Sequence, residues 1–152
     1  GAEDAGHEVF RFNTAFREVH PCIGCDRCRR EGVCTFAADD MKRLNPHLLA
    51  AEAVVFVSPI YYFDLSAQLK AVIDRFYAND DALHGGKRAL LLTAMADEDL
   101  GAAEGADATF RSICAYLQWE NAGILNAASA STAEDLTEED LRRAYDLGKD
   151  LK

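Results

Sequence analysis

The sequence predicts an α/β fold in which helices cover both faces of a parallel sheet, giving three layers. Two observations support this prediction. The continuous apolar runs at residues 53–57 and 89–94 have the profile of strands that are buried on both faces. Each run is followed by a stretch whose apolar side chains recur at helical spacing. In open sheets of this kind, ligands bind beyond the carboxyl ends of the strands.

The composition fits one domain and argues against several classes of protein. The chain has 152 residues, 49% of them hydrophobic, and a formal net charge of −10. Because phosphate recognition needs a basic face, we expect no nucleic-acid partner. No apolar run approaches the roughly 20 residues of a membrane span, and the opening GAEDAGHEVF does not have the pattern of a signal peptide. We therefore expect no membrane partner.

The elements before the first buried run are predicted from weaker patterns. Residues 9–12 alternate apolar and polar side chains, which indicates a half-exposed edge strand. Residues 39–49 have helical spacing and begin with two aspartates. Pro46 lies inside this stretch, so we expect either a kink or a new helix start with Asn45 as its cap.

The second half of the chain continues the alternation of strands and helices. The further predicted elements are helices within residues 65–78 and 102–118 and a short strand at 123–125. Asp64 or Ser66 can cap the first of these helices. A last helix is predicted after Thr137, because Asp140 follows three residues later and the pair matches a capping box.

Four of the five cysteines lie in one short stretch, PCIGCDRCRREGVC at residues 21–34. They are Cys22, Cys25, Cys28 and Cys34, with the spacing C-x2-C-x2-C-x5-C. A clustered set of this kind indicates a metal-binding or redox-active segment in a reducing compartment, and hence a cytoplasmic protein. Iron–sulfur cubanes take four thiolates, and tight C-x2-C-x2-C runs wrap a single cluster. The spacing therefore predicts one [4Fe–4S] cluster.

Other interpretations of this stretch stay open. Zinc is one, although structural zinc sites more often pair two separate C-x2-C knuckles. Free or disulfide-forming cysteines are another. His20 can be a substitute ligand or an ordinary solvated histidine. Arg27, Arg29 and Arg30 can offset the charge of a thiolate-bound cluster, attract the phosphates of NADPH, or form a solvated face. Cys114 lies on the apolar side of its helix and is expected in the core.

Three stretches together resemble the flavodoxin-like NAD(P)H-dependent FMN reductases, and especially their iron–sulfur flavoprotein branch. They are PCIGCDRCRREGVC, the DDM at residues 39–41, and AEAVVFVSPIYYFDLSAQLKAVIDRFYA at residues 51–78. The resemblance implies a flavodoxin-like fold, FMN as cofactor and NAD(P)H as electron donor. It also implies a small-molecule or protein electron acceptor, and a homodimer or higher homo-oligomer.

The resemblance places a flavin site at the ends of the two buried strands. The expected cofactor-binding residues are Ser58, Pro59, Ile60, Tyr61, Tyr62, Phe63, Thr93, Ala94 and Met95. Backbone N–H groups would bond the polar edge of the flavin, and an aromatic ring would cover one face. No side chain is named as catalytic, because the flavin itself carries the redox chemistry. The alternative is that residues 61–63 are ordinary core or interface aromatics.

The opening of the chain departs from the family pattern. Family members begin with a buried strand, a phosphate loop rich in Ser, Thr and Asn, and a first helix, whereas GAEDAGHEV looks like the end of that helix. We therefore expect residues 1–152 to be a single flavodoxin-like domain that is N-terminally incomplete, lacking its first strand and first helix. The cysteine motif is expected as an insertion at residues 20–36. The sequence upstream of Gly1 tests this expectation.

The function that these patterns favour is a flavin-dependent NAD(P)H oxidoreductase of the iron–sulfur flavoprotein type. It would pass electrons from the nicotinamide cofactor through FMN to an acceptor. One alternative is an electron-transfer or redox-sensing flavoprotein without turnover of its own. A second alternative is a zinc-stabilised interaction domain. Absorbance, reaction with NAD(P)H and metal content distinguish the three.

Overall fold

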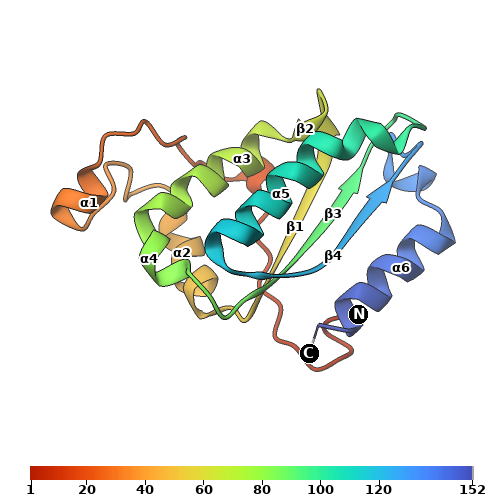
Figure 1. Cartoon of the computed structure of the whole chain (residues 1–152), viewed down its shortest axis with the longest axis horizontal. Helices are drawn as coiled ribbons and strands as arrows, with labels where there is room; N and C mark the ends of the chain where they lie inside the picture. Colours follow the sequence, from red (N-terminus) through yellow and green to blue (C-terminus); the bar gives the residue numbers. More distant parts are fainter. Residues whose placement is uncertain (152) are drawn as a thin grey trace.

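A four-stranded sheet forms the centre of the molecule (Figure 1). The computed structural model describes residues 1–151 and gives the strand order β2-β1-β3-β4. The strands are β1 (Ala53–Tyr61), β2 (Asp64–Leu65), β3 (Arg88–Ala94) and β4 (Glu120–Ala127). Strands β1, β3 and β4 run parallel, and the short β2 folds back antiparallel on the end of β1. The predicted parallel sheet is confirmed, with this one antiparallel addition.

The helices cover the sheet from both sides. They are α1 (Arg27–Glu31), α2 (Met41–Ala50), α3 (Ala67–Asp74), α4 (Asp80–Leu83), α5 (Glu104–Leu117) and α6 (Glu138–Lys149). Short 3₁₀ turns lie at η1 (Thr14–Phe16), η2 (Arg75–Asn79), η3 (Leu100–Ala103) and η4 (Ala133–Asp135). Helices α3 and α5 lie on one face, and α6 lies on the other (Figure 1). None of the helices within residues 1–151 has the length and apolarity of a membrane span.

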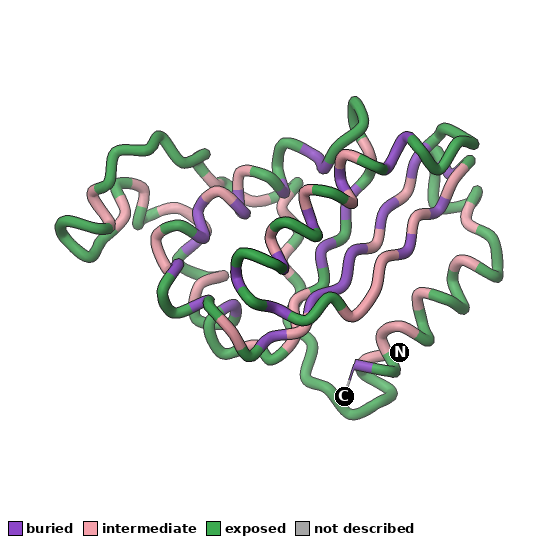
Figure 2. Tube along the Cα trace, viewed as in Figure 1, coloured by how far each residue is buried: buried purple, intermediate pink, exposed green. Residues whose placement is uncertain are grey.

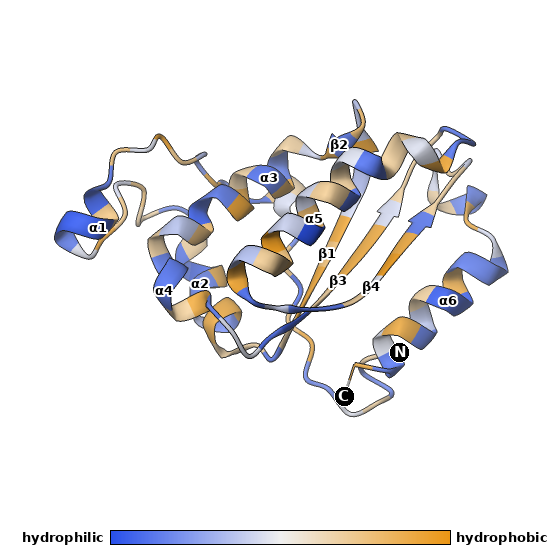
Figure 3. Ribbon diagram, in the orientation of Figure 1, coloured by the Kyte–Doolittle hydropathy of each residue, from blue (hydrophilic) through white to orange (hydrophobic). Residues whose placement is uncertain are grey.

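The main core fills the space between the sheet and the helices α3 and α5. The apolar strands run through the centre of the molecule (Figure 3), and the buried backbone follows them (Figure 2). Phe56 of β1 makes an edge-on contact with Phe110 of α5, at a ring-centroid distance of 5.9 Å, and Phe76 and Trp119 pack beside it. Each buried aromatic stabilises the fold by roughly 1.5–3 kcal/mol. This core fixes the sheet on which the functional loops sit.

The last helix forms as its sequence predicts. Thr137 Oγ1 accepts a hydrogen bond from Asp140 N at 3.1 Å, and the Asp140 carboxylate accepts one from Thr137 N at 3.2 Å. The predicted capping box is therefore confirmed. Helix α6 lies close against β4 at Gly123, where an added Cβ would come within 2.9 Å of the Leu147 side chain. Glycine at this position allows the helix to approach the strand.

The prediction of a strand at residues 9–12 is wrong. In the described part of the chain this segment has no hydrogen-bonded strand partner, and it is irregular backbone. Phe10 instead stacks on His47 of α2, with ring centroids 3.6 Å apart. Alternating side chains specify which faces a strand would have, but a strand exists only where a neighbour accepts and donates its backbone hydrogen bonds.

Three further boundaries differ from the sequence prediction. Helix α2 continues through Pro46 as one helix, so Asn45 does not start a new one. The helix predicted over residues 65–78 stops at Asp74 and continues as 3₁₀ turns, while Ser66, rather than Asp64, accepts the capping hydrogen bond at its start. Strand β4 is longer than the predicted 123–125. Boundaries of this kind depend on packing that local sequence does not encode.

Candidate functional site

A pocket lies where β1 and β3 end, and we call it the strand-end pocket. It has a volume of about 270 Å³. Its lining residues are Ile60, Tyr62, Phe63, Met95, Ala96, Asp97 and Ala102. The parallel ladder explains why these residues meet: Pro59 is paired with Ala94, so the residues that follow each strand emerge side by side. The walls are apolar and aromatic apart from Asp97, which suits a flat and mostly apolar ligand.

An aromatic turn forms one side of the strand-end pocket. Tyr62 and Phe63 connect β1 to β2 as a two-residue turn, and both have positive φ, at 48° and 68°. This is the pattern of a type I′ turn, which Asn and Gly usually occupy because other side chains are strained there. Tyr62 is 98% exposed and Phe63 is 64% exposed. The turn therefore holds two aromatic rings in solvent in a backbone conformation that disfavours them.

The start of α5 supports this turn. A Cβ at Gly105 would lie 2.3 Å from the carbonyl oxygen of Phe63, so only glycine permits the contact. Asp99 begins the preceding 3₁₀ turn, and its Oδ1 accepts a hydrogen bond from Gly101 N at 2.8 Å. The aromatic turn is thus packed against a firmly capped segment rather than free in solution.

Of the nine residues predicted to contact the flavin, four line the strand-end pocket. These four are Ile60, Tyr62, Phe63 and Met95. Ser58 and Thr93 are buried and serve the fold. Ser58 Oγ accepts a hydrogen bond from Ser66 N at 2.9 Å, and Thr93 Oγ1 donates one to Asn126 Oδ1 at 2.7 Å. The remaining three, Pro59, Tyr61 and Ala94, lie on the strands outside the pocket lining.

At the end of β3 the sequence prediction named only Thr93, Ala94 and Met95. The structure adds Ala96 and Asp97 from the loop that follows and Ala102 from η3. Strand register could have identified the first two, because both follow directly on the paired end of β3. Ala102 had no signal in the sequence, since its place depends on how the 3₁₀ turn folds back over the strand end.

The cysteine segment, residues 20–36, forms a second candidate site away from the sheet. Cys22, Cys25, Cys28 and Cys34 all line one small pocket of about 20 Å³. Thr35, Phe36, Arg75 and Tyr77 contribute to the same pocket. A volume of this size holds about one water molecule. The short helix α1 lies within the segment, which projects from the side of the molecule (Figure 1).

The thiols of the segment differ from the fifth cysteine. Cys22 and Cys25 are exposed and Cys28 and Cys34 are half-buried, whereas Cys114 lies in the core as predicted, where burial raises its pKa. The Sγ of Cys25 lies 3.2 Å from Thr35 Oγ1, and this contact, with the backbone N–H of Arg27, lowers the pKa of Cys25. The four clustered thiols therefore face solvent or their shared pocket.

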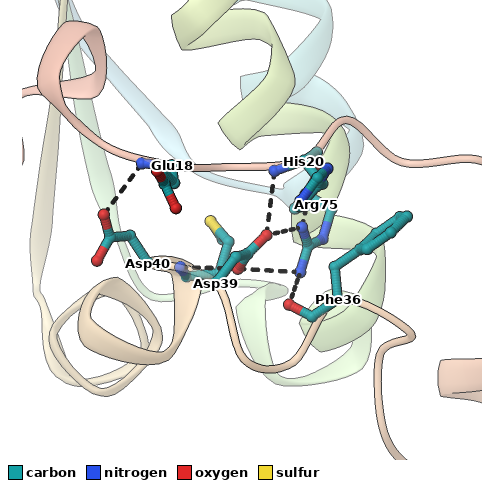
Figure 4. Close-up of polar contacts among 7 residues, drawn as sticks. Glu18, His20, Phe36, Asp39, Asp40 and Arg75 are labelled. Carbon is teal, nitrogen blue, oxygen red and sulfur yellow. Dashed lines mark hydrogen bonds and ion pairs between the residues drawn. The ribbon is translucent and has the colours of Figure 1, made fainter.

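The two ends of the cysteine segment meet at a buried ion pair (Figure 4). Arg75 and Asp39 are 4% and 5% exposed, and Arg75 Nη1 lies 2.6 Å from Asp39 Oδ2. Arg75 donates to the carbonyl oxygens of His20 at 2.8 Å and Phe36 at 3.2 Å. Asp39 Oδ2 accepts from His20 N at 3.1 Å. Residues at both ends of the segment are therefore bonded to one guanidinium.

The ionisation of Asp39 follows from these contacts. Burial by itself raises the pKa of this carboxyl, but hydrogen bonds from Arg75 and from the backbone N–H groups of His20 and Met41 outweigh it. The pKa of Asp39 is therefore held below its ordinary value, and the group is charged at neutral pH. A carboxylate and a guanidinium buried together compensate each other's cost of desolvation.

The ion pairs of helix α1 are more exposed than the Arg75–Asp39 pair. Arg29 donates to Asp80 at 3.1 Å and to Asp81 at 2.9 Å, and its guanidinium lies over the ring of Tyr77. Tyr77 in turn donates to Asp26 at 2.8 Å. Arg29 is thus committed to acidic partners, as Arg27 is to Glu31 in its own helix. Both guanidinium groups are therefore paired with carboxylates, which does not favour the alternative that they bind the phosphates of NADPH.

The cysteine segment has the donor atoms of a metal centre but not its geometry. Its donor chemistry fits, because four thiols surround one pocket next to a buried positive charge. Their spacing does not yet fit: within residues 1–151, no three His, Cys, Asp or Glu side chains come together as a group that could hold a metal ion. His20 stacks on Phe36 rather than pointing to the thiols. Binding therefore requires the segment to draw its cysteines inward.

Comparisons with known proteins agree with this arrangement of strands and loops. Residues 1–130 match the family model described as NADPH-dependent FMN reductase. An iron–sulfur flavoprotein from Archaeoglobus fulgidus is 34% identical over 85 residues, covering 55% of this chain and 38% of that protein. An FMN-dependent NADH:quinone oxidoreductase from Methylorubrum extorquens is 30% identical over 126 residues, covering 73% of this chain and 62% of that protein. The chain thus matches little more than a third of the iron–sulfur flavoprotein.

Solved structures share the fold. A structure titled as the Trp repressor binding protein from Bacillus subtilis superposes with a TM-score of 0.61 at 20% identity, over 74% of this chain and 75% of that one. A flavone reductase gives a TM-score of 0.67 at 15% identity and covers 99% of this chain and 53% of that one. At such identities the likeness concerns the α/β architecture alone.

Proposed function

Because the chain belongs to the family of NADPH-dependent FMN reductases, we propose that it acts as an FMN-dependent NAD(P)H oxidoreductase of the iron–sulfur flavoprotein type. The strand-end pocket is the observation that supports this proposal most directly. It lies beyond the carboxyl ends of two parallel strands, where ligands bind in open α/β sheets. Its walls have the apolar and aromatic character that a flavin ring requires.

The residues of the pocket have distinct tasks in this proposal. Tyr62 or Phe63 covers one face of the ring, and Met95 and Ala102 exclude water from the other side. Asp97 is the acidic group in the lining and faces the polar part of the ligand. When bound, FMN supplies the redox chemistry, by accepting a hydride from NAD(P)H and passing two electrons to an acceptor. The protein contributes position, polarity and the exclusion of competing reactions.

The cysteine segment is the second part of the proposal. We assign Cys22, Cys25, Cys28 and Cys34 as the ligands of one [4Fe–4S] cluster, which would divide the electrons from the flavin into single steps toward a small-molecule or protein acceptor. The shared pocket of the four thiols supports this assignment. So does the likeness to proteins named iron–sulfur flavoprotein. Zinc bound by the same thiols is the rival assignment.

The assembly and location of the protein follow as further proposals. We propose that residues 1–152 form a single domain with the cysteine segment as an insertion, and that the protein works in the cytoplasm, where thiols stay reduced. We also propose a homodimer or higher homo-oligomer. The exposed aromatic side chains of Tyr61, Tyr62 and Phe63 supply apolar surface for such contacts. Sedimentation of the purified protein at several concentrations measures the assembly.

Spectroscopy and kinetics of the full-length protein test the proposed activity. After anaerobic reconstitution with FMN, iron and sulfide, we expect flavin absorbance, iron and sulfide in equal amounts, and oxidation of NAD(P)H. Rapid bleaching of the flavin on mixing with NAD(P)H supports the oxidoreductase. Reduction only by a protein donor supports an electron carrier instead. One equivalent of zinc, with neither flavin binding nor NAD(P)H oxidation, would overturn the proposal.

A further inference from the structure

The pocket of the cysteine segment includes one residue that the proposed function has not used. Arg75 begins η2, directly after α3, and its side chain is 4% exposed. It lines the same pocket as the four thiols. Its Nη atoms are bonded, but its buried Nε–H has no hydrogen-bond partner among the described residues. A buried donor without a partner costs free energy, and this one belongs to a residue that lines the pocket of the four thiols.

The bonds of Arg75 connect the segment to the body of the protein at both ends. Its guanidinium donates to His20 O, two residues before Cys22, and to Phe36 O, two residues after Cys34. Asp39 completes the arrangement by accepting from Arg75 and from His20 N (Figure 4). A second pair of bonds lies just outside it, between Glu18 and Asp40. The base of the segment is therefore closed by polar contacts between protein groups alone.

The middle of the segment is held less firmly than its base. Its contacts with the body run through Arg29 and Tyr77. The pair of Arg29 with Asp81 is exposed and contributes little, whereas the pair with Asp80 is partly buried, because the Asp80 side chain is 11% exposed. Cys22 and Cys25 are exposed, and the four thiols do not form a metal-ligand group within residues 1–151. The part that has to move for metal binding is thus the part that is held weakly, whereas the buried base keeps its position.

We propose that the buried Arg75–Asp39 pair is a positioning device for the cysteine ligands. It holds the two ends of the cysteine segment together before metal arrives, so that binding rearranges only residues 22–34. The inference rests on the proposed function for its physiological ligand but not for its geometry. Arg75 is a positioning residue here, because it acts through the backbone of His20 and Phe36. Groups that hydrogen-bond metal ligands directly typically change metal affinity 10–100-fold. Arg75 acts one step further out, so the lower end of this range is expected.

Cadmium affinity of the reduced, metal-free protein tests the proposal without any redox activity. Cd²⁺ is titrated in, and the thiolate-to-metal absorbance gives the dissociation constant. Arg75→Lys keeps the charge but replaces the planar fork, whose two Nη atoms bond different acceptors, by a single nitrogen on a shorter side chain. We therefore expect its affinity to fall about tenfold or more. Asp39→Asn is the second variant, in case the first does not fold, and we expect it to weaken binding in the same direction.

Two control variants separate positioning from general stability. Lys70→Gln breaks the exposed ion pair with Asp74 on α3 and leaves the base of the segment intact. Leu125→Ala destabilises the protein from β4, where the side chain is 4% exposed. We expect both to bind Cd²⁺ as the unchanged protein does. If Leu125→Ala weakens binding as much as Arg75→Lys does, or if Arg75→Lys and Asp39→Asn bind normally, the proposal is wrong.

The cadmium titration distinguishes a failure of the positioning role from a failure of the proposed function. Should the unchanged protein bind Cd²⁺ but take up no iron and sulfide, the assignment of a cluster fails. The positioning role of Arg75 then still stands if the two variants lose cadmium affinity. A protein whose unchanged form binds no Cd²⁺ at all overturns the positioning role, because four thiols on a segment whose two ends are already held together must bind this ion.

Discussion

The strand-end pocket and the cysteine segment reach their geometry by opposite routes. Ile60 lies near the end of β1, and Met95 directly follows β3. They are far apart in sequence, yet they meet because Pro59 and Ala94 are paired in a parallel ladder. The four cysteines lie within residues 22–34, yet the structure does not bring them together as a metal-ligand group among the described residues. Backbone pairing fixes distant residues in place, whereas closeness in sequence does not by itself make side chains converge.

The two regions also differ in what stabilises them. The strand-end pocket inherits its shape from the sheet and from buried hydrogen bonds such as the one from Ser66 N to Ser58 Oγ. The cysteine segment depends on one buried ion pair at its base and on exposed contacts in its middle. Perturbing single residues in each region should therefore give effects of different size and kind.

Removing the buried carboxylate should have the largest effect. Asp39→Ala leaves the guanidinium of Arg75 buried without its partner, and we expect the free energy of unfolding to fall by about 3–5 kcal/mol. Urea denaturation followed by circular dichroism measures it. Lys70→Ala, which breaks an exposed pair on α3, is the matched control and should cost less than about 1 kcal/mol. Equal losses in both variants would contradict the distinction between the base of the segment and the surface.

A smaller loss of stability is expected from removing a buried hydrogen bond at the end of β1. Ser58→Ala deprives the buried N–H of Ser66 of its acceptor, which should cost about 1–3 kcal/mol and loosen the start of α3. The same denaturation experiment applies, with Ser112→Ala on the exposed side of α5 as control, for which we expect a change within about 0.5 kcal/mol. No loss in Ser58→Ala would mean that the strand end does not depend on this hydrogen bond.

The loss of folding stability at acidic pH should also depend on Asp39. Its pKa is lower in the folded than in the unfolded protein, so its contribution is fully present above the unfolded value of about 3.9 and is lost as the pH falls through the folded pKa. Between about pH 5 and pH 3, the unchanged protein should therefore lose stability more steeply than Asp39→Asn does. Urea midpoints measured across this range test it, and parallel curves for the two proteins would refute the role of this carboxylate.

The smallest change is expected at the aromatic turn, and it should have the opposite sign. Replacing Tyr62 by Asn and Phe63 by Gly gives the residues that a type I′ turn favours, so we expect the protein to gain about 1 kcal/mol of stability. FMN affinity, followed by fluorescence quenching, should fall because both rings leave the pocket. A variant that keeps its flavin affinity would show that the rings are not flavin contacts.

Much of the fold could be predicted because its elements carry strong local signals. The apolar runs at β1 and β3, the capping box of Thr137 and Asp140 and the place of Cys114 in the core were all visible in the sequence. The predicted strand at residues 9–12 was wrong because a period-two pattern cannot report whether a partner strand is present. The pocket lining was predicted in part: Ile60 and Met95 follow from strand ends, whereas Ala102 depends on a later turn.

The sequence by itself determined the type of fold, the family and the set of thiols, since periodicity, motif spacing and residue identity are properties of the chain alone. Only the tertiary structure decided that Arg75, thirty-six residues beyond Asp39, closes the cysteine segment, and that Ser58 and Thr93 serve the fold rather than the pocket. The physical reason is burial. A polar side chain takes the partner that the packed interior leaves within reach, and no local pattern records which partner that will be.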